Sequence, residues 1–204
     1  SILACFDYLK TRGARVTYLG VDENGQISLE ELAQKLTKET GLVSIMSANN
    51  ETGVIQPIHD AARLTEHAGA LFHTDLSQAT AFVPLNLQAS SIHMASFSGH
   101  KAYGPKGVGA LYRSIRKPRI DLHPILLGGG QEKGLRAGTL NTPGIAGLGH
   151  AFELISKKMV SDCRDSKAQM LGEGCLACLQ AVRSDSADEY AASSEVIPSI
   201  INTS

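Results

Sequence analysis

A glycine-rich loop that contains a lysine, residues 96–109, constrains this chain more than any other stretch. A short apolar run at residues 92–97 leads into the loop and a second at residues 108–112 leads out of it, which predicts a strand on each side. Glycines allow close backbone approach and left-handed torsions, and here they stand at positions 99, 104, 107 and 109. The loop is therefore suited to surrounding a ligand.

The side chains of this loop suggest both an anion site and a nucleophile. Ser98 and His100 can donate hydrogen bonds to an anion, and Lys101 offers an amine. Lysine amines attack carbonyl carbons when desolvation or neighbouring cations lower their pKa. A Walker A loop is excluded, because Gly104 is followed by Pro105 rather than by lysine. A hairpin with a solvated lysine at its tip remains an open alternative.

Composition narrows the class of protein. A chain of 204 residues, 43% of them apolar, is long enough for one substantial domain, or for one domain and part of another. The net charge of -1 gives no bulk attraction to nucleic acid or anionic membranes, and no apolar run approaches the roughly 18 residues of a membrane span. Of the four cysteines, only Cys175 and Cys178 form a C-x-x-C, without a second pair to complete a zinc site. We expect no metal, no nucleic acid and no membrane.

Strand and helix patterns alternate along the first two thirds of the chain. We expect helices at residues 1–13, 28–36 and 57–69, the second with a capping box of Ser28 and Glu31, and strands at residues 16–21, 42–46 and 70–73. The strand at 42–46 is almost continuously apolar, as in strands buried on both faces. Alternation of this kind predicts an α/β fold with a mainly parallel central sheet and flanking helices.

Three polar loops follow predicted strands. In such a sheet, ligands bind at the carboxyl ends of the strands. The loops at residues 49–51, 75–78 and 98–101 would then bring an amide, a carboxylate, a glutamine, a histidine and a lysine to one edge. Each loop also has a structural explanation, since asparagine is common in turns and aspartate often caps a helix. These explanations do not account for the position of all three loops at one edge.

The rest of the chain divides into further segments. A basic segment at residues 113–119 is interpreted as a solvated edge, and a second glycine-rich polar stretch covers residues 128–139. Helices are expected at residues 143–160 and about 165–182, followed by a polar linker and a strand at 196–201. We assign residues 1–183 to a large domain, 184–195 to the linker and 196–204 to the beginning of a small domain.

The polar and glycine-rich motifs of the chain resemble those of a known family. Four motifs in the right order match the cysteine desulfurases and selenocysteine lyases, class V members of the fold type I pyridoxal-phosphate (PLP) enzymes, and the resemblance covers nearly the whole chain. The motifs are residues 48–53 (ANNETG), 73–78 (HTDLSQ), 98–107 (SGHKAYGPKG), and 128–132 (GGGQE) with 136–139 (RAGT). The resemblance implies the large domain of a PLP-dependent transferase, here incomplete.

The resemblance also implies roles around the cofactor ring. Lys101 is similar to the lysine that binds PLP covalently and later moves the substrate proton. Asp75 is similar to the carboxylate that pairs with the protonated pyridine nitrogen, which makes the ring a better electron acceptor. Gln78 corresponds to a donor to the phenolic oxygen, and Asn50 to a residue beside that oxygen and the substrate carboxylate.

Further roles concern the PLP phosphate. Ser98 and His100 correspond to phosphate ligands, and Thr139 to a phosphate ligand donated by a partner subunit, which implies a homodimer. His73 and Arg136 lie inside matched motifs, but we assign them no chemistry.

Some family features have no counterpart in this chain. The family's phosphate-binding threonine and ring-stacking histidine would precede Ser1, and its nucleophilic cysteine loop and carboxylate-binding arginine would follow Ser204. None of Cys5, Cys163, Cys175 and Cys178 lies in a matching motif. We therefore expect the chain to be the central part of a longer enzyme.

The function implied is that of a PLP-dependent cysteine desulfurase. Such an enzyme cleaves the C–S bond of L-cysteine to give alanine and enzyme-bound sulfur, which it passes to an acceptor or scaffold protein for iron–sulfur cluster assembly or other sulfur transfer. A selenocysteine lyase acting on L-selenocysteine is the alternative within the family, and a catalytically incompetent cofactor-binding fragment is the alternative of another class. The expected location is cytoplasmic, or organellar if a transit peptide precedes the chain.

Overall fold

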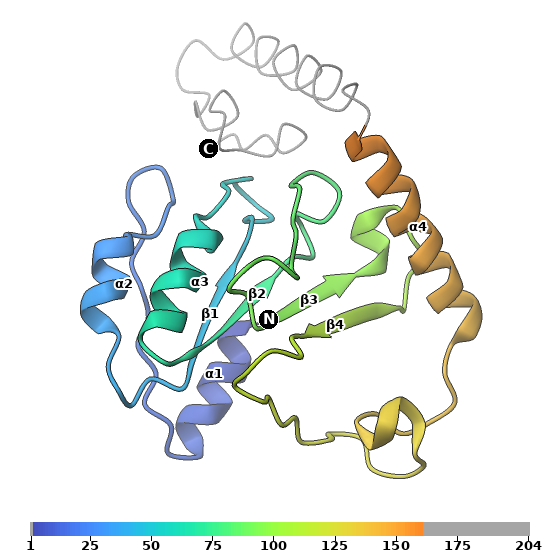
Figure 1. Cartoon of the computed structure of the whole chain (residues 1–204), viewed down its shortest axis with the longest axis horizontal. Coiled ribbons are helices and arrows are strands. Elements are labelled where there is room, and N and C mark those ends of the chain that lie inside the picture. The colour runs from blue at the N-terminus through green and yellow to red at the C-terminus, as the bar shows by residue number, and fades with distance from the viewer. Residues whose placement is uncertain (1, 161–204) are drawn as a thin grey trace, which may run out of the picture.

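A computed structural model describes residues 2–160 (Figure 1). Its elements in chain order are α1 (Ile2–Thr11), α2 (Leu29–Lys35), β1 (Leu42–Met46), α3 (Ile58–His67), β2 (Leu71–Asp75), β3 (Met94–Ser98), the 3-10 turn η1 (Gly99–Ala102), β4 (Gly109–Arg113), the 3-10 turn η2 (Gln131–Gly134) and α4 (Thr142–Val160). The predicted helix at 165–182, the linker at 184–195, the strand at 196–201 and the last three cysteines lie outside the described residues.

The strands form one sheet in the order β1-β2-β3-β4. The β1–β2 and β2–β3 pairs are parallel, whereas β4 returns antiparallel to β3, with Gly109 opposite Ser98. The structure therefore confirms the α/β fold with a mainly parallel sheet and flanking helices. It also places the starting point of β4 at the edge where β3 ends.

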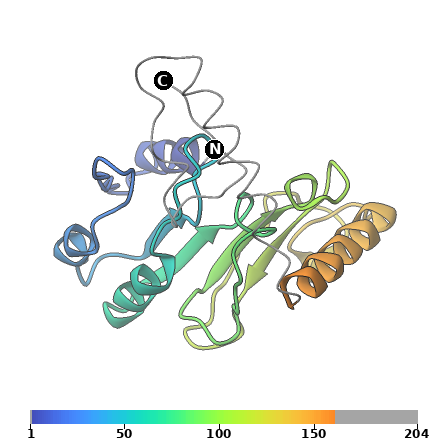
Figure 2. The ribbon, with the colours of Figure 1, turned by 90° about the horizontal axis from the view of Figure 1, so that it is seen from above.

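One face of the sheet is covered by helices. Side chains alternate along a strand, so Ile45, Phe72 and Ala95 share a face, and all three are buried in one core with residues of α2 and α3. Phe97 extends this face to α4, where its ring lies 5.6 Å from that of Phe152. Figure 2 shows α3 and α4 on this side of the sheet and α1 beyond the opposite one.

Helix α3 follows directly from its sequence pattern. Pro57 precedes the first turn, and the helix ends before Gly69, whose φ of +82° suits glycine. The buried residues recur at the spacing of one helical face: Ile58, Ala61, Ala62 and Thr65. The small alanines allow α3 to lie close against β1 and β2.

Three expectations about residues 16–46 need correction. The predicted strand at residues 16–21 is wrong: within it only Val21 forms a bridge, to Ile27. The carbonyl of Tyr18 accepts instead from Lys35 Nζ at 3.1 Å, so a side chain occupies a position that a strand partner would need. A turn follows, in which Gly25 N donates to Asp22 O at 3.0 Å.

β1 has the predicted bounds but is not buried on both faces. Leu42 and Met46 are each 38% exposed, because β1 is an edge strand among the described residues. The cap of α2 is also only partly as predicted. Ser28 Oγ accepts from Glu31 N at 3.1 Å, while the Glu31 carboxylate accepts from Gly20 N instead of completing the box.

The predicted helix at residues 143–160 is confirmed as α4, and its apolar side chains are buried to different extents. Leu148 and Ile155 are buried, whereas Ile145, in the first turn, is 42% exposed. None of the helices in residues 2–160 is both long enough and apolar enough to cross a membrane.

Candidate active site

The predicted loops do meet at one edge. Because β1, β2 and β3 are mutually parallel, their carboxyl ends point the same way. Asp75 is the last residue of β2, and Lys101 lies in η1 directly after β3. The turn with Asn50 follows β1. The structure thus brings Asn50, Asp75, Gln78, Ser98, His100 and Lys101 to the same edge of the sheet.

The lysine loop is held by its own backbone. Gly99 N donates to Val108 O and Gly104 N to Gly99 O, both at 2.9 Å, and Ser98 Oγ lies 3.0 Å from His100 Nδ1. Lys101 is exposed. The alternative interpretation was right about topology, because β3 and β4 form an antiparallel hairpin with the lysine in its connection.

The glycines of this loop serve close packing of the chain on itself. A Cβ on Gly109 would lie 2.5 Å from Phe97 O, and one on Gly99 would lie 2.8 Å from Pro105 O. Helix α4 braces the loop in the same way, since a Cβ on Gly147 would lie 2.6 Å from Pro105 Cγ. This contact between α4 and the loop was not predicted from the sequence.

Asp75 is oriented by the backbone that follows it. Its Oδ1 accepts from Ser77 N at 2.8 Å, and Oδ2 has no hydrogen-bond partner among the described residues. The neighbouring strands fix its main chain, because Ser47 N donates to Asp75 O and Leu76 N to Ser96 O, each at 2.9 Å. One carboxylate oxygen is therefore left to bind a ligand.

His73 lies one side-chain repeat before Asp75 on the same face of β2. Its Nδ1 is 2.8 Å from Ser44 Oγ, which stands directly opposite on β1. Burial lowers the pKa of His73, and the charge of Asp75 only partly opposes this. His73 had no predicted role, and Ser44 was not among the predicted site residues. The serine within the apolar run LVSIM was the available signal.

The two asparagines of the first loop have different surroundings. Asn49 Oδ1 accepts from Glu51 N at 2.8 Å and from Thr52 N at 3.0 Å, which makes Asn49 the turn-forming residue. Asn50 is exposed beside it. The predicted site residue is therefore the one left accessible.

Thr139 lies elsewhere. Its segment is held internally, with Gly138 N donating to Gln131 Oε1 at 3.1 Å and Arg136 Nη1 to Gly138 O at 3.2 Å. In Figure 1 the yellow η2 segment lies well apart from η1 and the end of β3. The structure does not bring Thr139 to the site of its own chain.

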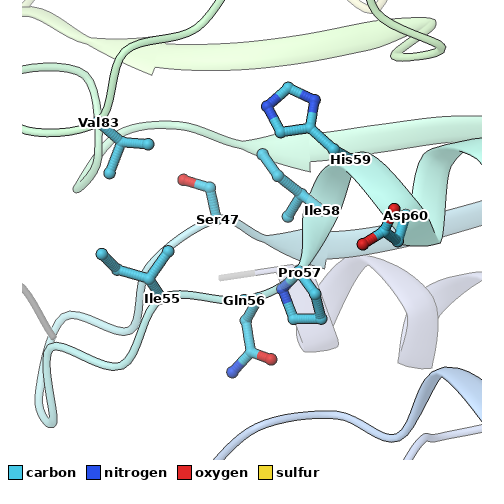
Figure 3. Close-up of a pocket in the computed structure, with 8 residues that line it drawn as sticks. All are labelled: Ser47, Ile55, Gln56, Pro57, Ile58, His59, Asp60 and Val83. Carbon is cyan, nitrogen blue, oxygen red and sulfur yellow. The ribbon is translucent and has the colours of Figure 1, made fainter. Parts of the chain in front are cut away.

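A pocket of about 180 Å³ opens on the α3 side of the sheet (Figure 3). It lies between the end of β1, the first turn of α3 and Val83, with Ser47 and several apolar side chains in its wall. None of the predicted site residues, all of which fall within residues 2–160, lines it. In the same range, no three histidine, cysteine, aspartate or glutamate side chains gather closely enough to hold a metal ion.

Comparison with known proteins identifies the family. The family model described as "Aminotransferase class-V" matches residues 1–198. The chain belongs to the aminotransferase class V family. This confirms the resemblance drawn from the four motifs.

Relatives of this class V chain carry a more specific name. It is 44% identical over 163 residues to "Cysteine desulfurase IscS" of Rickettsia rickettsii (strain Iowa), covering 80% of this chain and 40% of that protein. It is 51% identical over 154 residues to "Cysteine desulfurase, mitochondrial" of Drosophila melanogaster, covering 76% of this chain and 33% of that protein. The solved structure "SspA in complex with cysteine" matches with a TM-score of 0.77 at 33% identity, over 96% of this chain and 52% of the other. The chain thus spans well under half the length of these two curated relatives.

Proposed function

We propose that the complete protein is a PLP-dependent cysteine desulfurase that acts on L-cysteine. The observation that carries this proposal is the placement of Lys101 and Asp75 at the ends of adjacent parallel strands, facing one edge of the sheet. Relatives named cysteine desulfurase and a similar structure in complex with cysteine support the choice of reaction and substrate.

The chemistry of the donor set fits PLP. Ser98 and His100 offer hydrogen-bond donors for its phosphate, Gln78 an amide for its phenolic oxygen, and Asp75 a carboxylate oxygen for its ring nitrogen. Lys101 is exposed at the same edge, where its amine can bind the aldehyde carbon. When bound, PLP supplies a conjugated ring that accepts the electrons left on the substrate α-carbon.

Asp75 has an electrostatic role in this proposal. Its Oδ1 accepts a hydrogen bond from Ser77 N, so Oδ2 would be the oxygen that accepts a hydrogen bond from the protonated ring nitrogen of PLP. Each unit by which the carboxylate raises the pKa of that nitrogen corresponds to about 1.4 kcal/mol of preference for the charged ring.

Lys101 has two roles. Its Nζ would hold the cofactor, and as a free amine it would take a proton from the substrate and return it to the product carbon. Asn50, exposed in the turn that follows β1, would lie beside the phenolic oxygen of PLP and the substrate carboxylate.

We also infer a homodimer in which Thr139 binds the phosphate in the partner's site. Thr139 is exposed, and its segment lies apart from the strand ends of its own chain (Figure 1). The same segment exposes Ile125 at 93% and Leu127 at 82%, an apolar surface of the kind that a subunit interface covers. The sulfur acceptor would be a second protein, and a cytoplasmic or organellar location is part of this proposal.

The test uses the complete protein with PLP and L-cysteine. We expect equal amounts of alanine and protein-bound or released sulfur, and a matched assay with L-selenocysteine measures the preference between the two substrates. Failure to form alanine from either amino acid would overturn the proposed function. The same assay on the 204-residue chain tests whether this part alone is a cofactor-binding fragment without turnover.

A further inference from the structure

His73 and Ser44 form a bonded pair on the face of the sheet that carries the candidate site. The two residues are directly opposite in the parallel β1–β2 ladder, and Ser44 Oγ lies 2.8 Å from His73 Nδ1. Neither residue has a role in the function proposed above. His73 is bonded to the neighbouring strand and stands two residues before Asp75, the proposed partner of the cofactor ring. This arrangement suggests a role for His73.

The pair lies immediately beside Asp75. His73 and Asp75 alternate with the buried Thr74 along β2, so both project from the same face about 6.6 Å apart along the strand. The other residues of this face around His73 and Asp75 are Met46 on β1 and Met94 and Ser96 on β3, none of which titrates. Arg113 on β4, opposite Met94, donates to Ile120 O at 3.0 Å.

We propose that His73, tethered by Ser44, is a positioning residue for Asp75: its ring fills the sheet surface beside the carboxylate and leaves the negative charge of Asp75 free for the ring nitrogen of the cofactor. This inference rests on the proposed PLP function. A cationic side chain at this position would form an ion pair with Asp75 and compete with the cofactor. A small side chain would admit water, which weakens the same pairing.

The protonation of His73 agrees with this role. Burial is the main influence on the imidazole and lowers its pKa, and the Asp75 charge, which raises it, is the weaker effect. The ring is therefore neutral at neutral pH even though a carboxylate lies beside it. Ser44 holds one ring nitrogen and so restricts the orientation of the ring.

The test measures the cofactor rather than turnover. The complete protein is loaded with PLP, and two quantities are recorded: the pH midpoint of the visible absorption band, which reports the proton on the covalent link to Lys101, and the rate of PLP release. The variants are Ser44→Ala, His73→Asn and the double variant. Ser44→Thr, which keeps the hydroxyl, serves as the conservative rescue, and His67→Asn, at the exposed end of α3, is the matched histidine control.

We expect Ser44→Ala and His73→Asn each to raise the midpoint by about half a pH unit or more and to speed PLP release several-fold. Weaker pairing with Asp75 leaves the ring nitrogen less often protonated, which removes a positive charge conjugated with the covalent link. The double variant should add little to the larger single effect, because the two residues act as one unit. Ser44→Thr and His67→Asn should keep the original values.

Two results would overturn the inference. Unchanged midpoints and release rates in both single variants, with only a lower melting temperature, would show that the pair is purely structural. Full additivity in the double variant would show that Ser44 does not act through His73. If the unaltered protein has no visible band with PLP, the proposed function itself fails, and this inference fails with it.

Discussion

Neighbouring residues of β2 show how differently the two faces of the sheet are built. Phe72 and Thr74 are fully buried on the face that α3 covers, whereas His73 and Asp75, on the opposite face, are only partly buried. The covered face is apolar apart from isolated hydroxyls, and the other face carries Ser44, His73, Asp75 and Ser96. We therefore expect changes on the first face to affect mainly stability, and changes on the second to affect mainly the proposed chemistry.

The largest expected effect is at the candidate active site, on Lys101. Lys101→Ala should lower kcat by about a thousandfold or more, because it removes both the covalent link and the proton-transferring amine. PLP should still bind noncovalently through Ser98 and His100. Steady-state kinetics measures the loss, and borohydride reduction followed by peptide mapping locates the link.

Lys106→Ala is the matched control, since Lys106 lies in the same connection between β3 and β4. It should retain turnover and the borohydride-sensitive band. Reduction that traps PLP on Lys106, or normal turnover in Lys101→Ala, would contradict the assignment.

The next effect should fall on the covered face. Phe72→Ala removes a ring that is fully buried against α3 and should lower the free energy of unfolding by about 3–5 kcal/mol. Leu111→Ala, on β4 and 53% exposed on the opposite face, should change it by less than about 1 kcal/mol. Urea unfolding measures both, and equal losses would show that the two faces do not differ in stability.

A smaller effect is expected where helix α4 packs against the lysine loop. Gly147→Ala places a Cβ 2.6 Å from Pro105 Cγ and should cost about 1–3 kcal/mol as α4 is displaced from the lysine loop. We also expect weaker PLP binding, measured by equilibrium titration.

Gly149→Ala is the control within the same helix, because a Cβ there meets nothing within 4 Å. It should stabilise the protein by up to about 1 kcal/mol through helix propensity. Similar PLP affinity in both variants would show that α4 does not brace the site.

The smallest expected effect is a pH dependence of the free energy of unfolding, which comes from His93 on the covered face. His93 is buried, and its Nδ1 accepts from Phe72 N at 3.1 Å, a bond that protonation would remove. Burial is the main cause that lowers the pKa of His93, Arg116 lowers it further, and Glu66 opposes them. The unfolded chain therefore binds this proton more readily, so the stabilisation is complete above about pH 6.5 and is lost as the pH falls below it.

Urea unfolding at pH 7.5 and 5.5 measures this dependence. We expect the difference attributable to His93 to be below about 1 kcal/mol, and His93→Asn should reduce the pH dependence. The variant His73→Asn measures separately the contribution of His73, the other histidine whose pKa is lowered by burial. An unchanged pH dependence in His93→Asn would contradict the prediction.

Local sequence determined much of this protein, because many of its signals act within one turn or one strand. Pro57 and Gly69 bound α3, Ser28 caps α2, and the run at residues 42–46 has the bounds of β1. The order of the polar loops after strands was sufficient to predict which side chains reach one edge, since parallel strands share a direction.

Only the tertiary structure decided those contacts that join residues distant in the sequence. Residues 16–21 have the composition of a strand, but Lys35 and not a neighbouring strand binds the carbonyl of Tyr18. The Ser44–His73 bond requires the register of β1 against β2, and the Gly147–Pro105 contact requires α4 to return to the lysine loop. Strand register and helix docking are set by the packing of the whole core, so no local pattern could specify them.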